Sequence, residues 1–135
     1  MAPTVSYWDC GEFIAVSHTL GVPHPPGSPF FLLLGRIFSM LPFNEDIAFR
    51  VNIISPLVSA LAVMLLYLSI VKVVTHWRGK VNSLSDCLIV FGGGAAGALA
   101  FAFTDSHWFN AVEAEVYAFS TFFTAIVVWV NLIVE

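Results

Sequence analysis

Residues 51–71 read VNIISPLVSALAVMLLYLSIV, and this uncharged run decides how the chain folds. A helix rises about 1.5 Å per residue, so a run of this length can cross a hydrocarbon core of roughly 30 Å. Residues 60–68 are strong helix formers, and Pro56 falls in the second turn of the run, where a kink is tolerated. The run therefore predicts a transmembrane helix.

The composition as a whole is that of an integral membrane protein. Hydrophobic residues make up 59% of the 135 residues and charged residues 10%, and the mean hydropathy is +0.88. Two more uncharged runs, residues 87–104 and 116–134, are long enough to span a membrane. We predict an all-α membrane protein, a helical bundle with three transmembrane helices in a single membrane domain over residues 1–135.

The first 50 residues contain two shorter helical patterns. Residues 9–20 alternate acids with apolar residues at helical spacing, which suits a helix at the membrane surface. The proline-rich stretch 24–29 predicts a stiff, extended turn, although an ordinary loop would also explain it. Residues 30–41 are apolar but too short to cross the core, which favours an interfacial or re-entrant helix.

Positive charges predict how the helices are oriented. The segment from residue 72 to 86 carries Lys72, Arg78 and Lys80 against one acid, which is typical of a cytoplasmic loop. Counting crossings from this loop puts residues 1–50 and 105–115 on the opposite, extracytoplasmic face. Both acidic stretches of the chain should therefore lie on that face, where Trp8 and Trp108 fit an aromatic belt.

Several features limit the possible functions. The net charge is −4 with no basic run, so nucleic acid is excluded as a partner. Cys10 and Cys87 have no metal-ligand spacing and should lie near opposite faces of the bilayer, too far apart for a disulfide. No cluster of histidine and carboxylate stands at ligand spacing, so we predict that neither a metal nor another cofactor is required.

Two further patterns bear on packing and on the extent of the protein. A small-residue stripe at Gly93, Gly97 and Ala100 predicts close approach of another helix. The chain starts without an apolar leader, and its last apolar run ends without a Lys/Arg flank. We expect the sequence to be a fragment of a longer protein.

The strongest candidates for function are Asp9 and Glu12. On a helix their spacing places both carboxylates on one face, and acids held against a bilayer usually face a partner, a cavity or water. A solvated helix start is an equally good explanation of the pair. Glu113 and Glu115 form the second acidic stretch, where Glu115 could equally be a solvated helix start.

Basic side chains in the first 50 residues are candidates for binding a phosphate. Arg36 could hold an anionic phosphate or could extend to the lipid headgroups. Arg50 stands at the outer end of the first span, and His24 could donate a hydrogen bond to a phosphate from the start of the proline turn.

Four motifs, read together, resemble a known family: TVSYWDCGEFIA (4–15), HPPGSP (24–29), GRIFS (35–39) and WFNAVEAEVYA (108–118). They look like a bacterial DUF-type multi-spanning membrane family that is similar to the eukaryotic transmembrane protein O-mannosyltransferases. Such proteins resemble the GT-C glycosyltransferases, which take a sugar from a polyprenyl-phosphate donor. The resemblance implies a bacterial inner-membrane enzyme with its active site on the extracytoplasmic side and a protein hydroxyl as acceptor.

The resemblance also implies roles for the candidate residues. Asp9 would be the general base, with Glu12 orienting the acceptor or raising the basicity of Asp9, and Glu115 would be a weaker candidate for either role. The further members of the predicted site bind substrate: Trp8, His24, Arg36, Arg50, Trp108 and Glu113. A fragment that lacks the first and later transmembrane helices of this family is expected to be inactive alone.

Two other functions compete with glycosyl transfer. A transporter segment would use its acids for protons or cations, but would place them near the bilayer midplane, whereas the three spans here are uncharged. A structural subunit would use the small-residue stripe to pack against a partner. Only the acids and aromatic residues gathered on one face argue against this last alternative.

Overall fold

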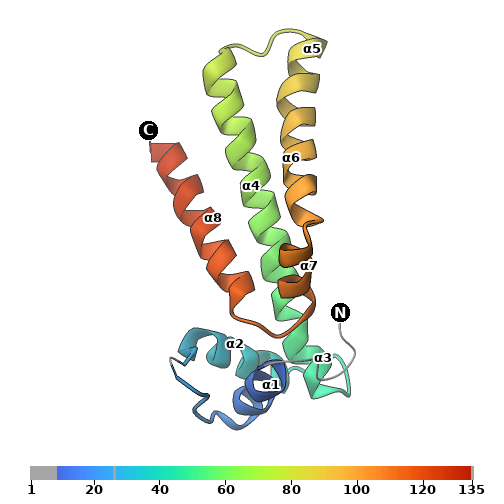
Figure 1. Cartoon of the computed structure of the whole chain (residues 1–135), viewed down its shortest axis with the longest axis vertical. Coiled ribbons are helices and arrows are strands. Elements are labelled where there is room, and N and C mark those ends of the chain that lie inside the picture. Colours follow the sequence, from blue (N-terminus) through green and yellow to red (C-terminus); the bar gives the residue numbers. More distant parts are fainter. Residues whose placement is uncertain (1–8, 26, 135) are drawn as a thin grey trace.

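The computed structural model of the chain describes residues 9–25 and 27–134. Over these ranges the chain is built of helices and contains no strand, with the longest helices running along its long axis (Figure 1). Three helical segments are long and apolar enough to cross a membrane: Ile47–Arg78, Leu84–Ala102 and Tyr117–Val134. The predicted all-α membrane fold with three membrane-spanning helices is confirmed.

The central helix is α4 (Ile54–Arg78), which packs against α8 (Tyr117–Val134) and α6 (Gly93–Ala102). It is longer than the predicted span, because nothing in the sequence interrupts it before Gly79, whose φ of +77° ends the helix. Lys72 and Arg78 therefore lie in the last turns of the helix, and the connection to the next helix is shorter than the expected 72–86 loop.

The first membrane-length segment is interrupted for one residue, just before Pro56. The short helix α3 (Ile47–Asn52) ends before Ile53, and Pro56 lies in the first turn of α4. Proline has no N–H, and its ring crowds the carbonyl four residues earlier, so it fits the first turn of a helix best. The sequence placed Pro56 in the second turn of the span, where a kink is tolerated; in the structure the helix is interrupted at Ile53, three residues before it.

The second membrane-length segment changes its helical register part-way. It consists of α5 (Leu84–Cys87), the π-helical turn η1 (Leu88–Gly92) and α6. A π-helical turn contains one more residue than an α-helical turn, so it rotates the helix that follows.

This rotation changes which glycines face α4. A Cβ atom at Gly94 would lie 2.9 Å from Val71 Cγ2, and one at Gly97 would lie 3.2 Å from Ile70 Cδ1, whereas Gly93 faces open space. Close helix packing at glycines therefore occurs at Gly94 and Gly97, of which Gly97 belongs to the predicted stripe. Its other members, Gly93 and Ala100, are exposed in this chain.

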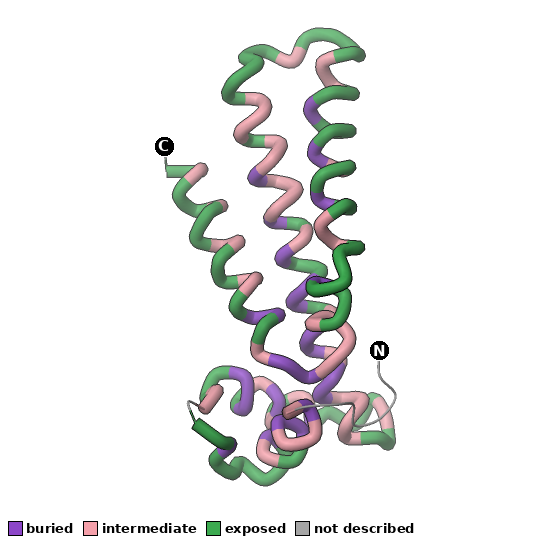
Figure 2. The backbone as a smooth tube through the Cα atoms, in the orientation of Figure 1, coloured by how far each residue is buried: buried purple, intermediate pink, exposed green. Residues whose placement is uncertain are grey.

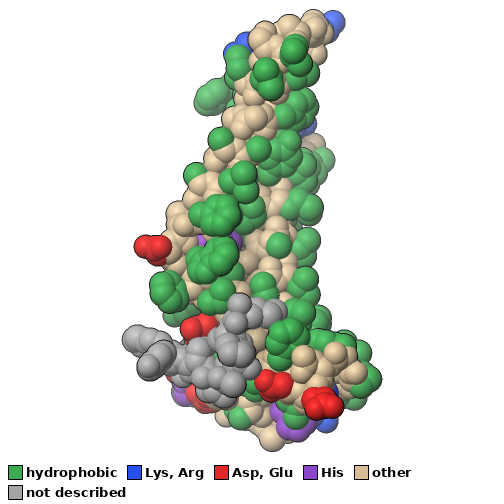
Figure 3. Space-filling model, turned by 90° about the vertical axis from the view of Figure 1, so that its right-hand side faces the viewer, with side chains coloured by type: hydrophobic (Ala, Val, Ile, Leu, Met, Phe, Trp, Pro, Cys, Tyr) green, Lys and Arg blue, Asp and Glu red, His purple; other side chains and the backbone are tan. Residues whose placement is uncertain are grey.

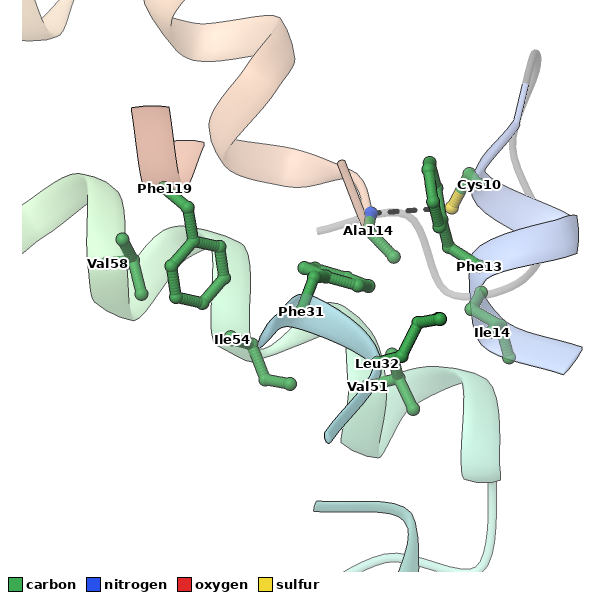
Figure 4. Packing of buried hydrophobic residues seen from close by; sticks show 10 residues of the cluster. All are labelled: Cys10, Phe13, Ile14, Phe31, Leu32, Val51, Ile54, Val58, Ala114 and Phe119. Atoms are coloured by element: carbon green, nitrogen blue, oxygen red, sulfur yellow. Dashed lines mark hydrogen bonds between the residues drawn. The ribbon is translucent and has the colours of Figure 1, made fainter. Parts of the chain in front are cut away.

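The chain builds its main core at one end of the long helices. There α1 (Cys10–Thr19), α2 (Pro29–Met40) and α3 lie beneath the long helices, and the connection into α8 packs against them (Figure 1). Buried positions concentrate at this end and along the inner side of α4 (Figure 2). The core residues are Cys10, Phe13, Ile14, Phe31, Leu32, Val51, Ile54, Val58, Ala114 and Phe119 (Figure 4).

Helices α1 and α2 meet at a glycine. A Cβ atom at Gly35 would lie 2.7 Å from Ser17 Cβ, so only glycine permits this approach. The next residue, Arg36, donates from Nη1 to the carbonyl oxygen of His18 and so satisfies a free carbonyl in the last turn of α1. The orientation of α1, which carries both candidate acids, is set by this contact.

Candidate functional site

The first turn of α1 holds both acids of the first stretch. Buried residues at helical spacing (Cys10, Phe13, Ile14 and Ser17) fix the face that α1 turns to the core. Asp9 is the N-cap residue, and its carbonyl accepts from the N–H of Phe13 at 2.9 Å. Asp9 and Glu12 lie beside the buried face, each partly exposed.

The segment after α1 returns along the helix and brings a histidine to these acids. Leu20 ends α1 with a φ of +54°, and Gly21 N–H donates to the Val16 carbonyl at 3.1 Å, which closes the helix end. His24 then lies opposite the first turn of α1. A second turn follows, in which Gly27 N–H donates to the His24 carbonyl at 3.1 Å.

Glu12 contacts His24 through both of its carboxylate oxygens. Glu12 Oε1 accepts the His24 backbone N–H at 2.8 Å, and Oε2 lies 2.7 Å from His24 Nδ1. The other ring nitrogen, Nε2, lies 3.7 Å from Asp9 Oδ2. The imidazole therefore lies between the two acids, Asp9 predicted as the general base and Glu12 predicted to orient the acceptor or to raise the basicity of Asp9.

Glu115 reaches the same place from the far end of the sequence. The connection before α8 is held by two buried contacts: Ala114 N–H donates to Cys10 Sγ and Glu115 N–H donates to Ser55 Oγ, both at 3.4 Å. Glu115 is buried, with 9% of its surface exposed. The two acidic stretches are grouped at one end of the molecule, because the charge of Glu115 interacts with those of Asp9 and His24; most of the acidic side chains visible in Figure 3 lie toward that end.

The charges of this cluster affect one another. The side-chain hydrogen bond that Glu12 accepts from His24 raises the pKa of His24, and the same bond lowers the pKa of Glu12. Burial raises the pKa of Glu115, and the nearby charges of Asp9 and Glu113 add to this increase. Three carboxylates, Glu12, Asp9 and Glu115, thus act on the charge of His24, and titratable groups with shifted pKa values are candidates for a functional site.

Neither arginine of the predicted site is paired with these acids among the residues described. Arg36 is bound to the His18 carbonyl, while Arg50 donates to the Asn44 carbonyl and, at 2.9 Å, to the Ser39 carbonyl. A guanidinium group has five N–H donors, so both arginines still have N–H groups that can donate to a phosphate. Their role in donor binding stays a prediction.

The tryptophans and Glu113 are placed less centrally. Trp8 lies outside the described residues. Trp108, in α7 (Asp105–Val112), stacks on Phe103 at 5.8 Å and, with the buried His107, lines a groove of about 420 Å³ between α4, α6 and α7. Glu113 is the C-cap residue of α7. Its negative charge contributes to the raised pKa of Glu115, which is its link to the cluster.

The ligand-type atoms of Asp9, Glu12 and His24 lie within 4.8 Å of one another, so the fold creates a grouping that sequence spacing did not predict. We assign no metal to it, because hydrogen bonds already join Glu12 to His24 and exposed acidic groups are common without an ion. The prediction that catalysis needs no metal stays a prediction.

Sequence reasoning missed the residues that hold the site together. Cys10, Asn52 and Ser55 are fully buried, and Cys10 Sγ lies 3.6 Å from Asn52 Oδ1. One signal could have found two of them: Asn52 and Ser55 are polar, stand one helical turn apart and interrupt an otherwise apolar run.

Membrane-length helices with an acid–histidine cluster at one end define an integral membrane protein with a polar site beside its apolar spans. Within that class, the chain belongs to the family described as the protein O-mannosyl-transferase TMEM260 N-terminal domain, which it matches over residues 9–135. The resemblance to membrane O-mannosyltransferases drawn from the motifs is confirmed.

Two curated relatives show the same similarity. The chain is 31% identical over 133 residues to protein O-mannosyl-transferase tmem260 of Dictyostelium discoideum and 33% identical over 119 residues to protein O-mannosyl-transferase TMEM260 of Mus musculus. The alignments cover 96% and 87% of this chain but only 14% and 15% of those proteins. No solved structure matches the chain.

Proposed function

We propose that this chain forms part of the active site of a membrane glycosyltransferase that moves a sugar from a polyprenyl-phosphate donor to a protein hydroxyl. The names of its relatives suggest that the sugar is mannose. One observation carries the proposal. Glu115, about 90 positions further along the sequence, lies close enough to the Asp9–Glu12–His24 group of the first 24 residues for their charges to interact, in a chain of an O-mannosyltransferase family.

The proposed reaction needs few groups. The acceptor hydroxyl oxygen attacks the anomeric carbon, the bond from that carbon to the phosphate oxygen breaks, and Asp9 takes the hydroxyl proton. The polyprenyl phosphate leaves with the bonding electron pair, so the configuration at the sugar inverts. A cation near the departing phosphate would assist, and His24, Arg36 and Arg50 are the candidates.

We place the reaction on the extracytoplasmic side, because Lys72, Arg78 and Lys80 surround the connection at the end of α4 farthest from α1, as expected of a cytoplasmic loop. Basic side chains are also present at the acidic end (Figure 3), where Arg36 and Arg50 are bound to backbone carbonyls. Single cysteines at Ser28 and Ser83, in a variant without native cysteines, should differ in labelling by an impermeant reagent. Ser28→Cys should react from outside and Ser83→Cys only after permeabilisation. Equal labelling of both from outside would overturn this orientation.

The test of the function uses the full-length protein reconstituted in liposomes. With a polyprenyl-phosphate mannose donor and an unfolded or folded protein acceptor, it should produce acceptor carrying mannose on Ser or Thr. Activity should persist after EDTA treatment, since no metal is invoked. Ion-driven uptake without sugar transfer would favour a transporter, and neither activity would favour a structural subunit.

A further inference from the structure

Glu12 is poorly placed to bind an acceptor, because His24 uses both of its oxygens. Oε1 accepts the His24 backbone N–H and Oε2 faces Nδ1, at 2.8 and 2.7 Å. An ionised carboxylate has no proton to donate, so Nδ1 must carry the hydrogen of that contact. The atom of the ring left for another partner is Nε2, which faces Asp9 at 3.7 Å.

Both ring nitrogens carry a proton only in the imidazolium form. In that form Nδ1–H bonds Glu12 while Nε2–H points to Asp9 Oδ2, and the 3.7 Å separation needs only a small closure to become a hydrogen bond. Asp9, Glu12 and Glu115 are the charged groups that face the ring, and all three favour its protonated form. Over the described part of the chain, His24 is the sole basic side chain paired with these acids.

We propose that Glu12 acts through His24, holding the imidazolium so that its Nε2–H orients the Asp9 carboxylate toward the acceptor hydroxyl. His24 is then a positioning residue, and Glu12 sets its orientation and charge. This inference rests on the proposed function, but it replaces the direct acceptor contact expected for Glu12 and the phosphate contact expected for His24.

The pH dependence of transfer separates this role from a structural one. Deprotonation of His24 removes the Nε2–H, so the rate should fall on the alkaline side of the pH profile. Because Glu12 raises the pKa of His24, Glu12→Gln should move that alkaline limb to lower pH while keeping the shape of the side chain. His24→Gln, whose amide can still donate but cannot titrate, should abolish the limb.

A double-mutant cycle gives the second readout. His24→Gln should lower kcat by about 10–100-fold with the KM for acceptor little changed, the range seen when an outer partner of a functional group is removed. Glu12→Gln should add less than about two-fold in that background, because it acts through the residue already lost. The matched control is His18→Gln. His18 is an exposed histidine on α1, the helix that carries Glu12, and its replacement should leave the pH profile unchanged.

Each result has one meaning in the full-length protein. If the fold-losses in kcat of Glu12→Gln and His24→Gln multiply in the double variant, and the KM for acceptor rises, Glu12 binds the acceptor directly and the inference is overturned. An unmoved alkaline limb together with a lower unfolding temperature would show that the contact only fixes the turn, and would overturn it too. A parent protein that transfers no sugar would instead overturn the proposed function, and this inference with it.

Discussion

Replacing Asp9 by Asn should lower the turnover of sugar transfer by about 10²–10⁴-fold and leave donor binding largely unchanged. Asparagine keeps the shape of the side chain but cannot accept the acceptor proton. The Asp9 side chain is half-exposed at the N-cap of α1 and makes no capping hydrogen bond, so α1 should survive the change. Single-turnover transfer and donor binding, measured separately, test the two parts of this expectation.

Asp105→Asn is the matched control, because Asp105 is an exposed acid in the first turn of α7. It should retain the parent rate. A near-normal rate for Asp9→Asn, together with a large loss for Glu115→Gln, would assign the base to the buried acid. Glu115 is a credible rival, since burial raises its pKa and carboxyl groups with raised pKa values are candidates for proton transfer.

The membrane-length helices and the order in which they cross could be predicted from the sequence, because each depends on the composition of a single segment. An uncharged run needs no partner to be recognised as a membrane-length helix, and counting crossings between the runs was enough to bring residues 105–115 to the end that holds Asp9. The proline-rich stretch 24–29 predicted a turn, and Gly27 N–H donates to the His24 carbonyl there, although Pro26 lies outside the described residues. These inferences required only local pattern and the connectivity of the helices.

Features that depend on the path of a loop or on helical register could not be predicted. The contact between Glu12 and His24 requires the left-handed conformation at Leu20, a residue type that rarely adopts it. The face of α6 that packs on α4 depends on the π-helical turn, which no sequence rule indicated. The buried contact of Ala114 with Cys10 joins residues 104 positions apart and follows only from the packed structure.

Gly35→Ala should destabilise the acidic end of the protein and reduce transfer with it. The added Cβ would lie 2.7 Å from Ser17 Cβ, an atom fixed to the backbone of α1, so the two helices must separate. Overpacking of this kind costs about 1–3 kcal/mol. Because α1 carries Asp9 and Glu12, a displacement of about 1 Å could also cost roughly 10²-fold in rate.

The cause can be isolated by removing the opposing atom. Ser17→Gly deletes the Cβ that the new methyl group would meet, and it removes a buried hydroxyl that has no hydrogen-bond partner in the described structure. The double variant should therefore recover most of the unfolding temperature and the rate lost in Gly35→Ala, less a helix-propensity cost of roughly 0.5 kcal/mol for glycine.

Gly92→Ala serves as the control for adding a methyl group to a helix, because a Cβ there would meet nothing within 4 Å. It should unfold at or above the parent temperature, since alanine favours the helix. If Gly35→Ala behaves like Gly92→Ala, or if Ser17→Gly fails to rescue it, the approach of α1 to α2 does not position the acids. Recovery of stability without recovery of rate would mean that the acids need a finer alignment than this helix contact provides.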